Sequence, residues 1–248
     1  MRRRDALIIG AAIATAVAIP PILRRTPSKL EFEALPGAPG FRRLTAGSFS
    51  GAIDPFFGLD ATPQDRAAQQ GFASKPLCLS LFGPQGWPDG KVPVAVFTDT
   101  NCPYCKVLEA RLFRLRDAGA PLWFYWHELP LLGPSSVRAA RATLGARALG
   151  AEDAARSYLA SHVLPPGPAG LARLSSALGV DPDALRTVVS GPLIDRQLAE
   201  SLWLSKRLGI PGTPGTIVGR TLFVGAIKDA DLDLLIEIEE GAPDAVCG

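Results

Sequence analysis

The sequence predicts an α/β domain, and three observations support that fold class. Two runs of apolar and β-branched residues, at 92–98 and 122–128, are typical of buried strands, and a helical pattern separates them. A mostly helical block follows at about 135–208. Two further short strands and a closing helix then complete the pattern near residue 240.

Residues 1–25 have the composition of a secretory signal peptide. Arginines at 2–4 precede a stretch without charge at 6–23, and Ala16-Val17-Ala18 offers a cleavage site. An uncleaved membrane anchor stays open, although these roughly 18 residues include two prolines and a spanning helix needs about 20. We therefore expect an exported, periplasmic protein whose N-terminus is either removed or anchored to the inner membrane.

The charge distribution argues against a nucleic-acid partner. The chain carries a formal charge of +2, and its first 25 residues hold five arginines and one aspartate, so the remaining residues sum to −2. A body with that balance lacks the broad basic surface of nucleic-acid-binding domains.

Residues 26–75 read as an extended N-terminal segment with short local structure, because they contain prolines and glycines and no sustained helical period. Within this segment, 42–44 and 54–57 are the candidates for docking apolar side chains onto the main domain. The main domain is expected over 76–248, and its first stretch, Pro76 to Phe82 (PLCLSLF), reads as an edge strand.

The strand at 92–98, the next helix and the strand at 122–128 form a βαβ unit, so the two strands should be parallel. Polar residues at 99–101 offer N-cap side chains for a helix that begins near Cys102. Its apolar stripe repeats at helical spacing, and Gly119 ends it. The stripe consists of Leu108, Leu112 and Leu115.

The second half of the chain completes the topology. Residues 216–218 and 221–224 flank Gly219-Arg220, which is a hairpin signal, and 228–240 form an amphipathic helix. The order β-α-β, helices, β-β-α is that of a thioredoxin fold with a helical insertion at about 135–208.

The strongest chemical signal is the stretch T-D-T-N-C-P-Y-C-K at 98–106, in which Cys102 falls at the start of the first helix. Unpaired N–H groups and the positive end of the helix dipole stabilise a thiolate at such a position, where the pKa of cysteine falls from about 8.5 to roughly 3.5–7.5. Cys105 lies one turn later on the same face. We therefore expect Cys102 to attack and Cys105 to resolve the mixed disulfide.

Two other interpretations of this pair are a zinc site and a structural disulfide. A zinc site needs two more ligands, but Cys78 and Cys247 form no second C-x-x-C, and the chain has only two histidines. A purely structural disulfide between Cys102 and Cys105 would close so small a loop that it adds little stability. We expect no metal and no cofactor.

Three separated motifs resemble the DsbA-like thioredoxin-domain family of exported thiol:disulfide oxidoreductases. The motifs, in order over roughly residues 77–240, are VPVAVFTDTNCPYC, HELPLLGPSSVRAAR and LGIPGTPGTIVGR. The resemblance implies a cis peptide bond between Thr213 and Pro214, with Thr213 lining the substrate groove; Pro211 is the competitor for the cis position.

The chain departs from the DsbA pattern at Tyr104, which stands where DsbA-type oxidases have histidine. With tyrosine at position 104, the chain lacks the histidine donor that helps to stabilise the thiolate. We therefore expect a dithiol that is less oxidising than that of DsbA, and the direction of electron flow stays open.

Two polar residues, His127 and Glu128, end the second strand of the βαβ unit. Parallel strands bring their C-terminal ends to one edge of the sheet, which is also the edge of the cysteines. Either residue is a candidate for moving the proton of Cys105. The alternative is a polar strand end without a chemical role.

The remaining cysteines, Cys78 and Cys247, are hypothesised to form a structural disulfide between the start of the main domain and the tail. The alternatives are a tail thiol and intermolecular pairing. In an exported chain, four cysteines are read first as thiol and disulfide chemistry.

The sequence therefore predicts an exported thiol:disulfide oxidoreductase that acts on protein substrates and depends on a membrane or soluble redox partner. The alternative is a peptide-binding or chaperone-like module with a structural disulfide, and a third is an enzyme acting on a small thiol such as glutathione. The sequence alone leaves the substrate and the oligomeric state undetermined.

Overall fold

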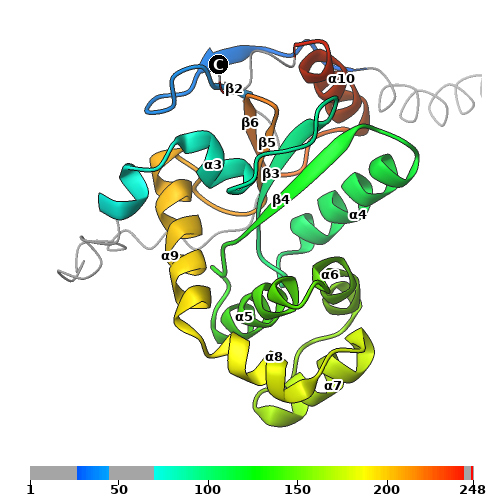
Figure 1. Ribbon diagram of the computed structural model, residues 1–248. Helices are drawn as coiled ribbons and strands as arrows, with labels where there is room; N and C mark the ends of the chain where they lie inside the picture. Colours follow the sequence, from blue (N-terminus) through cyan, green and yellow to red (C-terminus); the bar gives the residue numbers. More distant parts are fainter. Residues whose placement is uncertain (1–26, 45–69, 243–246, 248) are drawn as a thin grey trace, which may run out of the picture.

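The computed structural model describes residues 27–44, 70–242 and 247. The predicted signal or anchor at 1–25 and the docking candidate at 54–57 lie outside these residues. The described chain contains six strands and eight helices that carry element labels (Figure 1). Within these ranges, no helix combines the length and the apolar composition that a membrane crossing requires.

The elements follow the predicted order, and two short strands precede them. In chain order they are β1 (Phe32–Ala34), β2 (Arg42–Leu44), α3 (Leu77–Phe82), β3 (Val92–Thr98), α4 (Pro103–Asp117), β4 (Leu122–Glu128), α5 (Pro134–Ala148), α6 (Glu152–Ser161), α7 (Pro168–Leu178), α8 (Pro182–Val189), α9 (Pro192–Arg207), β5 (Gly215–Val218), β6 (Thr221–Val224) and α10 (Asp229–Glu240).

The six strands form one mixed sheet with the order β1-β2-β6-β5-β3-β4. Strands β3 and β4 are parallel, as the βαβ pattern predicts, with Val92 opposite Leu122 and Thr98 opposite Glu128. Strand β5 is antiparallel to both β3 and β6. The thioredoxin topology predicted from the element order is therefore confirmed.

Helices cover both faces of the sheet (Figure 1). Side chains alternate along β3, so Val94 and Val96 face a core shared with α4 and α10, while Ala95 and Phe97 face a core shared with α3 and α9. All seven residues of β3 are buried, which explains why the strand reads as one apolar run.

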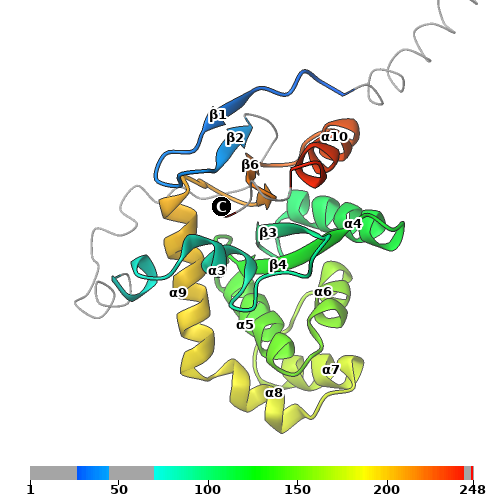
Figure 2. The same cartoon turned by 45° about the horizontal axis from the view of Figure 1, so that its top comes forward.

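The helical insertion forms a small core of its own. Helices α5, α6, α7 and α8 gather at the end of the molecule opposite β1 and α10 (Figure 2). Their shared core is apolar and includes Ala142, Leu159, Leu174 and Leu185. Helix α9 then leads back to the sheet, where its Leu204 and Leu208 are fully buried.

The N-terminal segment adds two strands to the sheet. Strand β2 pairs in parallel with β6, and its Leu44 is buried in the core next to α10. Arg42 forms an ion pair of 2.7 Å with Glu239 of α10 and lies over the ring of Phe32 in β1. The docking that the sequence predicts for 42–44 is thus a strand-pairing interaction.

The predicted edge strand at Pro76 to Phe82 is wrong, because residues 77–82 form the short helix α3. None of the six strands of the sheet pairs with residues 77–82. The helix instead buries Leu81 and Phe82 against the sheet, while Leu79 stays exposed. A short run of leucines fits a helical face as well as a strand, so the pattern alone does not decide.

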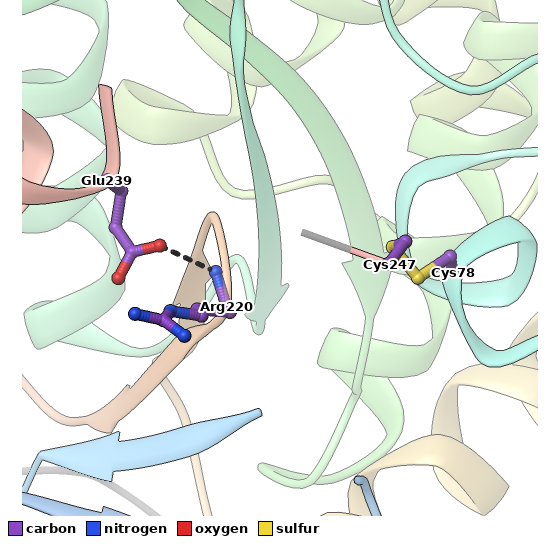
Figure 3. The surroundings of a disulfide bond; sticks show 4 residues. All are labelled: Cys78, Arg220, Glu239 and Cys247. Atoms are coloured by element: carbon purple, nitrogen blue, oxygen red, sulfur yellow. Dashed lines mark hydrogen bonds between the residues drawn. A yellow bond between two sulfur atoms is a disulfide. The ribbon is translucent and has the colours of Figure 1, made fainter. Parts of the chain in front are cut away.

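Helix α3 is joined to the tail by a disulfide between Cys78 and Cys247, whose Cα atoms are 5.9 Å apart (Figure 3). The two cysteines are 169 residues apart in sequence. The bond therefore connects the beginning and the end of the main domain, the pairing hypothesised from the sequence.

Candidate functional site

Cys102 is itself the N-cap of helix α4. Its sulfur accepts a hydrogen bond from the backbone N–H of Cys105 at 3.3 Å. Pro103 occupies the first turn of the helix, where a backbone N–H would have no partner within the helix, so its missing N–H costs no hydrogen bond. The sequence assigned the cap to residues 99–101, and that assignment is wrong. A cysteine sulfur that accepts a hydrogen bond from a helix N-terminus is in the electrostatic environment that favours thiolate.

Residues 99–101 instead attach the loop before the cysteines to the helical insertion. Asp99 is buried, and its carboxylate accepts hydrogen bonds from the Ser136 hydroxyl at 2.7 Å and from the backbone N–H of Leu132 at 3.0 Å. The Asn101 side-chain amide donates to the hydroxyls of Ser135 and Ser136. These bonds fix the beginning of α5 beside the dithiol.

Cys105 lies one helical turn behind Cys102 and is only 1% exposed. Both cysteines are present as thiols in this structure. Burial raises the pKa of the Cys105 thiol far above its ordinary value, and its hydrogen bond to Cys102 raises it further. Hydrogen bonds from the backbone of Asp99 and from Thr98 oppose the rise only in part. Cys105 is therefore protonated at neutral pH and needs a proton acceptor before it can attack.

The loop before β5 faces Cys102 from the other side. The peptide bond between Thr213 and Pro214 is cis, and the Cys102 thiol donates to the Thr213 carbonyl at 3.4 Å. Pairing of Phe97 with Gly215 places the start of β5 beside the end of β3, so the register brings this loop to the dithiol. Gly215 is required here, since a Cβ atom on it would come within 2.5 Å of the Ile210 side chain.

Tyr104, between the two cysteines, points outward. It is 40% exposed, and Val107, one turn further along α4, is 64% exposed. Two large apolar side chains thus lie at the surface of the helix that carries the dithiol. They are available for contact with a bound chain.

His127 is directed away from the cysteines' helix. Its imidazole contacts the Leu81 carbonyl at 2.9 Å and the Ser201 hydroxyl at 3.4 Å, and its ring stacks on Phe97. Burial lowers its pKa to about 4, so the imidazole is neutral at pH 7. It borders a cavity of about 450 Å³ between α3, β4, α5 and α9, whose lining includes neither cysteine.

Glu128 lies on the opposite side of β4 from His127 and is held by Arg156 of the insertion. Burial raises its pKa to about 7. Arg156 also forms an ion pair with Glu109 of α4, at 3.8 Å. Glu109 and Arg156 are not among the site residues predicted from the sequence. Glu109 carried a readable signal, because it stands four residues after Cys105 and therefore on the same helix face.

The described ranges contain no cluster of three or more His, Cys, Asp or Glu side chains arranged to hold a metal ion. What the site offers is a pair of adjacent buried thiols, one at a helix N-terminus and the other one helical turn behind it. On a neighbouring loop, the backbone carbonyl of Thr213 contacts the first thiol. Such an arrangement can exchange disulfides through a mixed-disulfide intermediate.

Comparison with known proteins assigns this geometry to a family. The family model described as DSBA-like thioredoxin domain matches residues 93–236. No curated protein sequence matches the chain.

Three solved structures illustrate the similarity. A thioredoxin-like oxidoreductase from Silicibacter pomeroyi DSS-3 is 32% identical, with a TM-score of 0.59, and the match covers 66% of this chain and 98% of that one. The thiol-disulfide exchange protein alpha-DsbA2 from Wolbachia pipientis is 22% identical, with a TM-score of 0.59 and coverage of 71% and 98%. A periplasmic thioredoxin-like protein from Salmonella enterica serovar Typhimurium is 23% identical, with a TM-score of 0.54 and coverage of 68% and 98%. The last two, at this identity, support the fold alone.

Proposed function

Because the chain belongs to the family of DSBA-like thioredoxin domains, we propose that it is an exported thiol:disulfide oxidoreductase that exchanges disulfides with protein substrates. The observation that carries the proposal is the contact between the Cys102 thiol, the N–H of Cys105 and the Thr213 carbonyl. It joins a helix N-terminus, the backbone of the second cysteine and the cis-proline loop at one sulfur atom.

In the reducing direction, the Cys102 thiolate attacks one sulfur of a substrate disulfide. A bond forms between Cys102 and that sulfur, and the other substrate sulfur leaves as a thiolate that takes a proton. Cys105 then loses its proton and attacks Cys102, which forms the Cys102–Cys105 disulfide and releases the second substrate thiolate. Two electrons pass from the dithiol to the substrate, and the oxidising direction is the reverse.

The groove that receives the substrate is proposed to lie between Tyr104 and the loop of Thr213 and Pro214. Buried Thr213 faces Cys102 through its backbone carbonyl. We propose that an extended substrate segment pairs with the backbone of this loop, as in strand-addition recognition. Tyr104 supplies an apolar surface beside the attacking sulfur.

Export and a periplasmic location are proposed from residues 1–25, whose basic start and uncharged stretch match a signal peptide. The second disulfide, between Cys78 and Cys247, agrees with an oxidising compartment. A membrane or soluble partner would have to restore the dithiol or the disulfide after each turnover.

The proposal is tested with the single variants Cys102→Ser and Cys105→Ser. Cys102→Ser should abolish exchange with a protein disulfide, while Cys105→Ser should accumulate a mixed disulfide through Cys102, visible by non-reducing mass spectrometry. The double variant Cys78→Ser, Cys247→Ser is the matched control and should keep exchange. Normal exchange by Cys102→Ser would overturn the proposal and favour a binding module with structural cysteines.

The direction of transfer is tested separately, with a reduced and a scrambled substrate in parallel. An oxidase accelerates disulfide formation in the reduced substrate. An isomerase recovers native pairing from the scrambled one. The absence of the histidine at Tyr104 favours the second outcome, because a less stabilised thiolate makes the disulfide a weaker oxidant.

A further inference from the structure

The cavity of about 450 Å³ beside His127 lies between α3, β4, α5 and α9, four elements that can be followed in Figure 1. It is thus at the boundary between the sheet and the helical insertion, and neither cysteine lines it. Small-molecule sites favour such boundaries, and volumes of about 300–1,000 Å³ are typical of them. The exchange mechanism makes no use of this cavity, so its lining calls for a separate explanation.

Most of the cavity wall is apolar. Leu144 is buried in it, whereas Leu79 and Leu193 are 44% and 58% exposed. The ring of Tyr125 adds an aromatic surface, and it packs so closely on Gly83 that a Cβ atom there would lie 2.7 Å from the ring. A ligand with an apolar body would remove the exposed leucine surface from water, which is favourable.

The walls are connected to one another by polar contacts. His127 of β4 contacts the Leu81 carbonyl of α3 at 2.9 Å and the Ser201 hydroxyl of α9 at 3.4 Å. The ammonium group of Lys75, just before α3, donates to Glu200 of α9 at 2.8 Å. Because these contacts already fix α3 and α9 on β4, a ligand would enter a site that is largely formed and would lose little affinity to ordering it.

The charged side chains of the lining are unequally satisfied. They comprise three cations and one carboxylate: Lys75, Arg147, Arg196 and Glu200. Glu200 is paired with Lys75. Arg147 binds Glu152 through Nε and Nη2, but its Nη1 makes no hydrogen bond in the described part of the chain. Arg196 forms neither an ion pair nor a hydrogen bond with any residue that the structure describes. The charged donors left over are therefore both guanidinium groups.

We propose that this cavity binds a small organic carboxylate with an apolar body, and that Arg196 pairs with the carboxylate. The planar fork of a guanidinium group matches the two oxygens of a carboxylate. The apolar body covers Leu79 and Leu193 and lies against the ring of Tyr125. Since Arg196 is exposed, solvent screens its charge, so the ion pair contributes selectivity for an anion and the apolar body contributes most of the affinity.

The test is an NMR titration of the full chain with three probes in parallel. Cinnamate has both the apolar body and the carboxylate, cinnamamide has the same body without the charge, and acetate has the charge without the body. The wild type should bind cinnamate with a dissociation constant on the order of 1 mM, as expected for so small a ligand. Cinnamamide should bind about fivefold more weakly, and acetate should not bind measurably. The largest shifts are expected at Leu79, Tyr125 and Gln197.

Two variants separate the charge from the cavity. Arg196→Gln should weaken the binding of cinnamate about fivefold and leave that of cinnamamide unchanged. Arg173→Gln is the matched control, because it removes an exposed arginine of α7 that does not line the cavity. Gln197→Trp, which places an indole in the cavity, should abolish the binding of both probes. Its thermal unfolding and its disulfide exchange should match the wild type, which shows that the variant is folded.

Three results would overturn the proposal. Equal binding of cinnamate and cinnamamide, unchanged in Arg196→Gln, would show that the cavity does not select an anion. Binding that survives Gln197→Trp would place the probe elsewhere on the molecule. A wild type that binds neither probe, beside a variant with residues 54–57 replaced by glycine and serine that binds both, would show that a segment of this chain fills the cavity.

Discussion

At the scale of the residue, we propose that Tyr104 influences how strongly this dithiol oxidises. It lies between the cysteines and is 40% exposed, so a substitution there meets little steric resistance. The phenol adds no positive charge beside Cys102, whereas an imidazolium would stabilise the thiolate. A more stable reduced form makes the corresponding disulfide a stronger oxidant.

We therefore expect Tyr104→His to shift the potential upward by about 30 mV or more, a tenfold change in the glutathione equilibrium. Tyr104→Phe is the matched control, since it keeps the ring and adds no positive charge. An unchanged potential in Tyr104→His would mean that this position does not govern the stability of the thiolate.

His127 gives a second prediction at this scale, in the pH dependence of stability. Its folded-state pKa is lowered to about 4, from about 6.5 in the unfolded chain. Between pH 6.5 and pH 4, His127 is protonated in the unfolded state but stays neutral in the folded state. The unfolding free energy therefore falls as the pH decreases towards 4. From pH 7 to pH 5 this costs about 2 kcal/mol.

Glu128 contributes with the opposite sign, because its folded-state pKa is raised to about 7 and stability falls as the pH rises from about 4 towards 7. The two effects partly cancel in the wild type. The difference in unfolding free energy between the wild type and His127→Gln isolates the histidine and should shrink by about 2 kcal/mol from pH 7 to pH 5. A difference that is constant with pH would show that His127 is not buried in neutral form.

At the scale of the element, the loop between β3 and α4 is positioned by Asp99. Its carboxylate joins that loop to Leu132 and Ser136 at the beginning of the insertion. Asp99→Ala leaves the N–H of Leu132 and the buried hydroxyl of Ser136 without their acceptor, so we expect a loss of about 2–4 kcal/mol in unfolding free energy and faster alkylation of Cys105.

Asp181→Ala is the control for that substitution. Asp181 caps helix α8 by accepting from the Ala184 N–H at 2.7 Å, far along the chain from the dithiol. Its loss should cost about 1 kcal/mol and leave cysteine reactivity unchanged. If both variants alter alkylation equally, Asp99 has no specific role in holding the dithiol.

How far the sequence predicts an element depends on how much of its environment is local. Strand β3 and the apolar stripe of α4 were predicted correctly. A strand buried on both faces appears as a continuous apolar run, and a helix appears as an apolar repeat at helical spacing, so both patterns can be recognised within one short segment. Helix α3 was predicted wrongly as a strand, because its short apolar run fits either element and its packing partners in β3 and α9 are distant in sequence. The cap at Cys102 was missed, because its partner is a backbone N–H and not a residue type.

The candidate site divides in the same way. Cys102, Cys105 and the loop of Thr213 and Pro214 could be located from motifs and a family resemblance. The buried ion pairs of Arg156 with Glu109 and Glu128 could not be located in this way, since the three residues come from three elements and meet only in the folded chain. Arg156 carries no sequence signal that distinguishes it from the other arginines of the insertion.

At the scale of the whole molecule, the disulfide between Cys78 and Cys247 closes most of the main domain into one loop. A cross-link over 169 residues removes loop entropy from the unfolded state worth on the order of 5 kcal/mol in the chain-entropy model. We expect Cys78→Ser with Cys247→Ser to lower the unfolding free energy by about 2–5 kcal/mol without abolishing exchange. Mass mapping of the non-reduced protein must show a peptide pair joining residues 78 and 247, or the cross-link is absent.

The two cysteine pairs lie in different surroundings. The Cys78–Cys247 disulfide joins α3 to the tail, whereas Cys102 and Cys105 lie at the N-terminus of α4, beside the loop with the cis-proline. An inert structural disulfide has a reduction potential below about −300 mV, whereas redox-active pairs lie above it.

The reduction potential of the Cys102–Cys105 pair tests the central claim most directly. Equilibration with glutathione, followed by mass analysis of the two thiols, should give a value above about −300 mV and below the roughly −120 mV of DsbA. A value below about −300 mV would show that the pair is structural, and it would contradict the assignment of Cys102 and Cys105 as the exchanging dithiol.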